Sequence, residues 1–127
     1  KQIYDSLNVK NVAHVLEDGQ VEFDRGAGPI IYVKLDAAAA KACSVLQVQL
    51  THSLEEATAM IVYYAPKNSK EKVADRSQAV WQVAGDRRQS VFLQATEGFE
   101  PTIRIQPVHK TQKHTIKEIF VGCLIPR

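Results

Sequence analysis

The chain has 127 residues, which is the length of one domain with a single hydrophobic core. Hydrophobic residues make up 45% of it and charged residues 24%, which excludes a disordered or collagen-like chain. It contains no run of about 18 apolar residues, so we expect no insertion into a membrane. The net charge of +2 is too small to indicate a nucleic-acid-binding protein.

We expect residues 1–127 to form one domain, because the chain has no Pro/Gly/Ser-rich linker and no internal repeat. It begins with Lys1 rather than Met and has no secretory signal, so we expect a domain excised from a longer protein. Residues 1–63 carry 5 basic and 8 acidic groups, whereas residues 64–127 carry 11 basic and 6 acidic groups. The sequence indicates no cellular compartment.

Alternation of apolar and polar residues, the period of a β-strand, dominates the chain. It predicts about eight strands, at residues 20–23, 30–36, 45–51, 59–65, 79–83, 90–95, 102–106 and 114–125. A spacing of roughly 10–15 residues between strands is typical of an antiparallel sandwich or barrel. The predicted core residues are Ile31, Val33, Leu46, Val48, Ile61, Val91, Leu93, Ile103, Ile105, Ile119 and Val121.

Four segments carry further signals. In the strand at residues 45–51 we expect a bulge, because apolar residues occur at both parities. Asp36 precedes four alanines and Lys41 and is predicted to cap one or two helical turns. Residues 6–16 fit a short helix and an N-terminal strand equally well. The charged segment 67–76 is predicted to be a long solvated loop.

The two cysteines, Cys43 and Cys123, lie 80 positions apart, which excludes a zinc ribbon because such a site needs CxxC spacing. A disulfide is possible, but a pair of buried free thiols is the favoured prediction. His14, His52, His109 and His114 are predicted to lie on the surface, and the lysines between the last two would repel a metal ion.

No catalytic residue, metal or cofactor is predicted. The chain lacks a GxSxG motif, and no histidine has an acidic residue two positions later, as an iron site of the double-stranded β-helix type requires. Glu55 and Glu56 would point to opposite faces of a strand. Glu22 and Asp24 flank a glycine-containing loop and could bind calcium, but the rim of a hairpin explains them better.

The largest positive feature is the segment 109–117, together with Arg87, Arg88 and Arg104. Because the segment has no aromatic residue for base stacking, we expect no nucleic-acid partner. An anionic polysaccharide or a phosphate-bearing partner would fit it, and so would a solvated hairpin tip, which we favour.

Aromatic residues in the predicted strands favour a sugar ligand. Apolar sugar faces pack on exposed rings, and sugar hydroxyls need planar hydrogen-bonding groups. Tyr63 and Tyr64 point to opposite faces, so one of them is available to a ligand. Trp81 would supply a further ring, although a single Trp in a sandwich is more often part of the core. Polar partners at strand positions are Gln82, Gln94, Arg104 and Gln106.

Two segments near the end of the chain, AVWQVAGDRRQSVFLQA and PTIRIQPVHKTQKHTIKEIFV, carry a family resemblance. They resemble the closing strands of galactose-binding-like jelly rolls that occur as carbohydrate-binding modules of bacterial glycosyltransferases and polysaccharide enzymes. The Tyr63-Tyr64 pair and the segment VEFDRGAGPIIYVKL fit the same group. Gln106 stands where that group has Asp.

The resemblance implies an all-β, antiparallel jelly-roll β-sandwich that binds a glycan or polysaccharide without catalysing a reaction. Such a module is expected to belong to a larger polysaccharide-handling protein with a neighbouring catalytic domain. The expected ligand-binding residues are Tyr63, Tyr64, Trp81, Arg104 and Gln106. The alternative is a structural or protein-interaction sandwich that orients a neighbouring domain, which an exposed apolar patch would favour.

Overall fold

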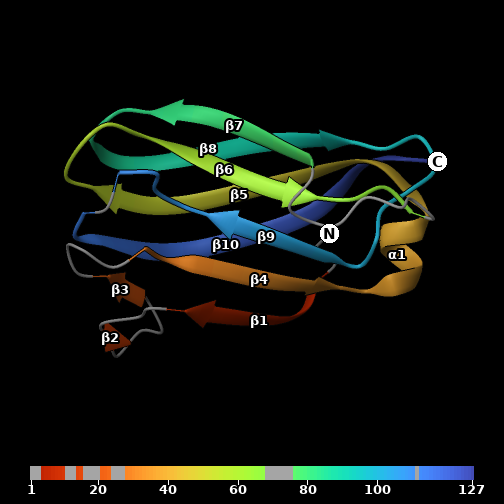
Figure 1. Cartoon of the computed structure of the whole chain (residues 1–127), viewed down its shortest axis with the longest axis horizontal. Helices are drawn as coiled ribbons and strands as arrows, with labels where there is room; N and C mark the ends of the chain where they lie inside the picture. The colour runs from red at the N-terminus through yellow and green to blue at the C-terminus, as the bar shows by residue number, and fades with distance from the viewer. Residues whose placement is uncertain (1–3, 11–13, 16–20, 24–27, 68–75, 111) are drawn as a thin grey trace.

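The computed structural model describes residues 4–10, 14–15, 21–23, 28–67, 76–110 and 112–127, which hold ten strands and one short helix in two layers (Figure 1). In chain order the elements are β1 (Tyr4–Lys10), β2 (His14–Val15), β3 (Val21–Phe23), β4 (Ile30–Leu35), α1 (Ala37–Lys41), β5 (Cys43–Leu54), β6 (Thr58–Tyr64), β7 (Arg76–Gln82), β8 (Gly85–Gln94), β9 (Thr102–Gln106) and β10 (His114–Pro126).

The strands form two five-stranded antiparallel sheets. The front sheet has the order β1-β4-β9-β6-β7 and the back sheet the order β2-β3-β10-β5-β8. In Figure 1 the front sheet lies over the back sheet, and β7 runs beside β8 along the upper edge. From β3 to β10 the chain passes from one sheet to the other at every step except β6 to β7, as in an eight-stranded jelly roll, and β1 and β2 each extend one sheet at its edge. The predicted jelly-roll sandwich is confirmed, and the ambiguous segment contributes strands rather than a helix.

The core lies between the two sheets, where the inward side chains of both meet. Nine of the eleven predicted core residues are buried, but Ile61 and Ile119 are only partly buried. Ile61 lies at the outward parity of β6, where Met60 and Val62 take the inward positions. Ile119 pairs with the buried Leu50 and packs against the core, so its predicted direction is correct although it is not fully buried.

The bulge predicted in β5 is wrong. From Val45 to Leu54 this strand pairs with β8 without a register shift, and Leu46, Val48 and Leu50 all face the core. The pairing of β5 with β10 shifts at three places, and the extra residue lies in β10 at two of them and in β5, at Ser44, at the third, outside the predicted range. Leu46, Val48 and Leu50 share one parity, so regular alternation alone places them on one face.

Helix α1 begins as predicted, with the Asp36 side chain accepting a hydrogen bond of 2.9 Å from the Ala39 backbone N–H. It has five residues, and no helix in the described part of the chain is long and apolar enough to cross a membrane. Gly98 packs on its last turn with a φ of 88°, and a Cβ there would lie 2.3 Å from the Lys41 carbonyl oxygen. Both the backbone conformation and the close approach therefore require glycine.

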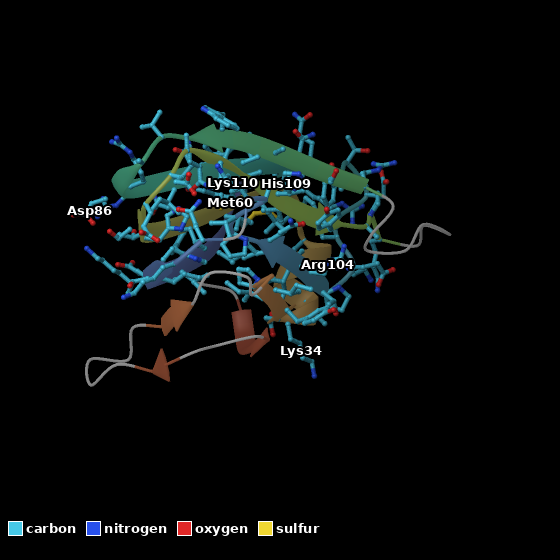
Figure 2. The ribbon with its side chains drawn as sticks, turned by 60° about the vertical axis from the view of Figure 1, so that its left-hand side comes forward. Lys34, Met60, Asp86, Arg104, His109 and Lys110 are labelled. Carbon is cyan, nitrogen blue, oxygen red and sulfur yellow. A yellow bond between two sulfur atoms is a disulfide. The ribbon has the colours of Figure 1, made fainter. Side chains whose placement is uncertain are left out.

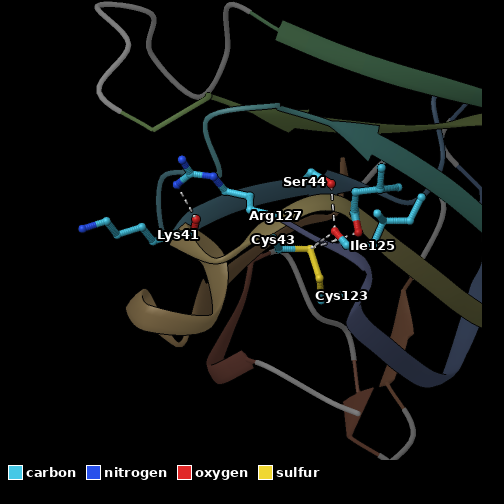
Figure 3. The surroundings of a disulfide bond; sticks show 7 residues. Lys41, Cys43, Ser44, Cys123, Ile125 and Arg127 are labelled. Atoms are coloured by element: carbon cyan, nitrogen blue, oxygen red, sulfur yellow. Dashed lines mark hydrogen bonds between the residues drawn. A yellow bond between two sulfur atoms is a disulfide. The ribbon is translucent and has the colours of Figure 1, made fainter.

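A disulfide joins Cys43 at the start of β5 to Cys123 in β10, with their Cα atoms 5.8 Å apart (Figure 3). The preference for two free thiols is therefore wrong, because antiparallel pairing of β5 with β10 brings these distant residues together. Nearby, the Ser44 hydroxyl donates to the Ile125 carbonyl (2.9 Å) and the Arg127 guanidinium donates to the Lys41 carbonyl (3.1 Å). The end of the chain is thus fastened to the start of β5.

Candidate functional site

The outward side of the front sheet, called the front face below, carries most of the residues predicted to bind a ligand. Tyr63 on β6 lies directly opposite Arg104 on β9, and Arg104 lies directly opposite Tyr32 on β4. Gln106 follows two positions after Arg104 and shares its face. The register therefore places Arg104 between two tyrosines, each on a neighbouring strand. Neighbouring strands are about 5 Å apart.

Direct contacts hold Tyr63, Arg104 and Gln106 together. The guanidinium carbon of Arg104 lies 4.3 Å from the centroid of the Tyr63 ring, a cation–π contact. The Tyr63 hydroxyl donates to Gln106 Oε1 (3.3 Å), and Gln106 Nε2 donates to the Val108 carbonyl (3.4 Å). These contacts restrict the rotamers of the three side chains before any ligand arrives, which lowers the entropy lost on binding.

Trp81 and Tyr64 have opposite environments. Trp81 on β7 is 66% exposed and faces outward opposite Ala59, so the expectation that a single Trp belongs to the core does not hold here. Tyr64 is buried, with its ring centroid 5.9 Å from that of Phe99. The front face therefore includes Tyr63 and Trp81, and Tyr64 belongs to the core.

Tyr32 is a ring of the front face that the analysis of the sequence did not select. It is 37% exposed and lies between the buried core residues Ile31 and Val33. The parity of the predicted strand already placed it on the outward side. Only the register of β4 with β9 shows that it neighbours Arg104.

A shallow hollow of about 210 Å³ borders the front face at Arg104 and Gln106. The other lining residues are Gly28, Pro29 and Ile30, at the start of β4. The lining combines apolar carbon from Pro29 and Ile30 with the guanidinium and amide groups of β9. The hollow thus offers polar and apolar groups side by side, in a volume smaller than that of a typical pocket for a drug-sized ligand.

Gln82 and two histidines lie between the sheets rather than at the front face. His52 and His114 are 0% and 2% exposed, so the prediction of surface histidines is wrong for both, whereas His109 is exposed. The His52 side chain donates through Nε2 to Gln82 Oε1, and Gln82 Nε2 donates to the Pro107 carbonyl (3.1 Å). Burial lowers the pKa of His52, and it lowers the pKa of His114 to about 4.

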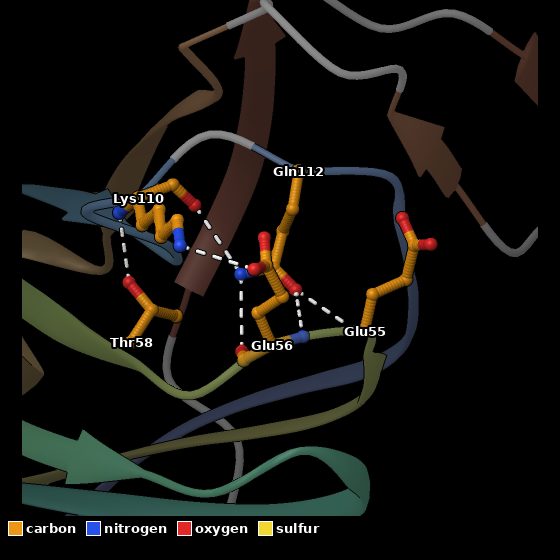
Figure 4. A network of polar contacts seen from close by, with 5 residues as sticks. All are labelled: Glu55, Glu56, Thr58, Lys110 and Gln112. Carbon is orange, nitrogen blue, oxygen red and sulfur yellow. Dashed lines mark hydrogen bonds and ion pairs between the residues drawn. The ribbon is translucent and has the colours of Figure 1, made fainter.

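Gln112 closes the turn between β5 and β6 (Figure 4). Its Oε1 accepts from the backbone N–H groups of Glu55 and Glu56 (both 2.9 Å), and its Nε2 donates to the carbonyls of Glu56 (3.1 Å) and Lys110 (3.2 Å). It is fully buried, and its hydrogen bonds satisfy backbone groups that the turn leaves unpaired. We call His52, Gln82, Gln112 and His114 the buried polar cluster.

The basic segment 109–117 has structural partners in the folded protein. Lys110 pairs with Glu56 (3.0 Å), and Lys117 pairs with Asp86 (3.2 Å). The backbone N–H groups of His109 and Lys110 both donate to the Thr58 hydroxyl. This pairing favours the solvated-hairpin interpretation over an anion-binding site.

The described residues contain no group of three or more His, Cys, Asp or Glu side chains placed to hold a metal ion. Asp24, the second residue of the calcium hypothesis, lies outside the described residues, as does most of the predicted loop 67–76.

No protein-family model matches the sequence, and no curated protein matches it either. Solved structures do match the fold. A pectin-binding carbohydrate-binding module shares 10% identity, with 98% of this chain and 94% of that chain covered and a TM-score of 0.56. The solved structure of a family CBM4 module shares 8% identity over 95% of this chain and 78% of that one, with a TM-score of 0.55.

Part of a larger enzyme also matches the fold. A family GH115 4-O-methyl-alpha-glucuronidase with specificity for decorated arabinogalactans shares 8% identity over 95% of this chain, with a TM-score of 0.59. The matching region is only 16% of that enzyme's chain. The protein therefore has the jelly-roll fold found in carbohydrate-binding modules, as the resemblance of its closing strands predicted. The narrower likeness to the galactose-binding group stays a prediction.

Proposed function

We propose that the protein is a non-catalytic carbohydrate-binding module and that it binds glycan on the front face. One observation carries the proposal. Tyr32 and Tyr63 flank Arg104 across three adjacent strands, and the Gln106 amide is hydrogen-bonded to Tyr63 beside them. Rings that stack on apolar sugar faces thus lie next to planar groups that hydrogen-bond to hydroxyls.

The shape of the front face favours a chain of several sugars. Trp81 lies four residues along β7 from Ser77, which is paired with Tyr63, so the two rings are roughly 14 Å apart along the strand direction. The side chains between them are those of Ala59, Ala79 and the half-buried Ile61. These side chains project less from the sheet than the two aromatic rings. A single monosaccharide would not reach both rings.

Membership of a larger polysaccharide-handling protein, with a neighbouring catalytic domain, forms part of the same proposal. The GH115 glucuronidase and a phage tailspike protein are much longer chains in which the matching region covers 16% and 18%. Such likeness supports an accessory role for this fold. The disulfide adds support, because disulfides persist in oxidising compartments, outside the reducing cytosol.

A titration of the purified protein with a panel of neutral and acidic polysaccharides tests the proposal. We expect weak binding to at least one polymer, and we expect Trp81→Ala to weaken that binding roughly tenfold, or about 1.4 kcal/mol. The matched control is Phe92→Ala, because Phe92 is 51% exposed on the outward side of the back sheet. Binding to no polymer, or equal losses in the two variants, would contradict the proposal.

A protein-interaction module is the second candidate, and one surface favours it. Phe92, Leu124 and Ile125 are each more than half exposed and line a hollow of about 670 Å³ together with Val45. Exposed apolar groups in one patch are typical of interaction sites. Leu124→Ser separates the two candidates, because it alters this hollow and leaves the front face unchanged. If Leu124→Ser weakens glycan binding as much as Trp81→Ala does, the front face is not the glycan site.

A further inference from the structure

On the four strands of the front sheet whose side chains the structure describes, the outward charges have one sign. On β4, β6, β7 and β9, the described outward side chains include two charged groups, Lys34 and Arg104, and both are cations. Two described carboxylates at the ends of these strands have other partners: Asp36, after β4, caps α1, and Glu100, before β9, pairs with Lys67 at 3.8 Å. A polymer that binds this face therefore meets positive charge with no carboxylate on the four strands to repel its own anions.

The N–H groups of Arg104 are available to a ligand. Its guanidinium carbon lies over the Tyr63 ring, 4.3 Å from the centroid, and no described acceptor bonds to any of its N–H groups. A cation–π contact uses the face of the aromatic ring and leaves the five N–H bonds, which lie in the guanidinium plane, to other partners. A carboxylate that approaches in this plane can accept two parallel hydrogen bonds, the geometry in which arginine binds carboxylates most strongly.

The hollow beside Arg104 places apolar and amide groups next to the guanidinium. Pro29 and Ile30 offer an apolar wall, and Gln106 offers an amide next to the guanidinium. A pyranose ring packed on the wall would direct its exocyclic group towards β9. Lys34 is the diagonal neighbour of Arg104, with about 7–8 Å between their strand positions, which suits the carboxylate of a second sugar.

We propose that the ligand is a uronic acid polymer, with Arg104 binding a sugar carboxylate and Lys34 adding long-range attraction. This inference rests on the proposed function of the front face. The two cations, the guanidinium of Arg104 and the ammonium group of Lys34, match in number the carboxylates of two sugars in a polymer with one carboxylate per sugar. A densely sulfated polymer would need a larger cluster of cations than the four strands show. Figure 2 shows the two side chains on the same side of the sandwich, far from Asp86.

Polygalacturonate and the same polymer after chemical reduction of its carboxyl groups are the two probes, titrated in buffer containing EDTA to prevent gelling by calcium. We expect the native polymer to bind at least tenfold more tightly than the reduced one. That preference should shrink as NaCl is raised from 0.05 M to 0.5 M, because salt screens exposed charges. Equal binding of the two polymers would overturn the inference and leave the proposed function standing.

Substitutions at Arg104 test its role directly. Arg104→Gln should abolish the preference for the native polymer while keeping the weaker binding to the reduced one. Arg104→Lys should restore only part of the preference, because an ammonium group lacks the planar fork. The matched control is Arg88→Gln, which removes an exposed arginine from the outward side of the back sheet and should leave the preference intact.

Two further outcomes are decisive. If Arg104→Gln leaves the preference unchanged, or if dextran sulfate binds as tightly as polygalacturonate through Arg104, a carboxylate-specific site is contradicted. If neither form of the polymer binds and no neutral polysaccharide binds, the proposed function itself fails. Thermal unfolding of each variant shows whether it is folded, and Arg104→Lys serves as the folded variant should Arg104→Gln unfold.

Discussion

The front face and the buried polar cluster contain similar side chains in different roles. Each combines rings with glutamine amides on β-strands, and in each a glutamine hydrogen-bonds to a ring-bearing side chain and to a backbone carbonyl. They differ in exposure: the front face is open to solvent at Tyr32 and Trp81, whereas His52 and Gln82 are fully buried. Exposed polar groups can exchange hydrogen bonds with water for hydrogen bonds with a ligand. Buried polar groups must find their hydrogen-bond partners within the protein.

This comparison leads to a simple expectation. Changes at the buried polar cluster should lower the free energy of unfolding and leave glycan affinity unchanged in the folded protein. Changes at the front face should lower glycan affinity and hardly alter stability, since surface substitutions usually change stability by less than about 0.5 kcal/mol. The predictions below test that separation, beginning with the largest effect.

Removing the disulfide tests whether a loss of stability alone disturbs the front face. Because the bond closes a loop of 80 residues, Cys43→Ala with Cys123→Ala should lower the free energy of unfolding by about 4 kcal/mol. Urea denaturation measures the loss, and glycan titration below the transition should match the wild type. A large fall in affinity of the folded double variant would show that the two properties are coupled.

Acid should destabilise the protein through the buried histidines. The pKa of His114 is lowered to about 4 in the folded protein, so the unfolded chain binds its proton first as the pH falls. The stability contributed by neutral His114 is complete above pH 6.5 or so and declines towards pH 4, by about 3 kcal/mol. The lowered pKa of His52 acts in the same direction.

Urea denaturation at several pH values between 7 and 4 measures this decline. His114→Gln should flatten the pH dependence, whereas His109→Gln, a change at an exposed histidine, should leave it intact. A wild-type protein whose stability stays constant over this interval would contradict the burial of neutral histidines.

Gln112→Ala should have the smallest effect of the three on stability, about 2 kcal/mol. The change removes the four hydrogen bonds of the buried Gln112 amide, including those that it accepts from the backbone N–H groups of Glu55 and Glu56. Denaturation measures the loss, with Gln94→Ala as an exposed control. Glycan affinity should not change, because Gln112 lies outside the front face. A drop in affinity comparable to that of Trp81→Ala would break the distinction between the two regions.

Alternation along the chain was sufficient to predict an antiparallel sandwich or barrel and nine buried core residues, while the resemblance of the closing strands implied the jelly roll and Asp36 before the alanines predicted the cap of α1. Each of these depends on neighbours within a few positions, and the period of two is a local property of an extended backbone. Alternation also indicated that Tyr63 and Tyr64 face opposite ways, as the burial of Tyr64 confirms. It failed at Ile61 because β6 has apolar residues at both parities.

What only the tertiary structure decided is which distant residues meet. The register of β4, β9 and β6 brings Tyr32, Arg104 and Tyr63 into one row, and the pairing of β5 with β10 joins Cys43 to Cys123. Burial of His52 and His114 likewise follows from the packing of one sheet on the other. Alternation states which side of a strand a residue occupies, but strand order and register are set by the packing of the whole chain.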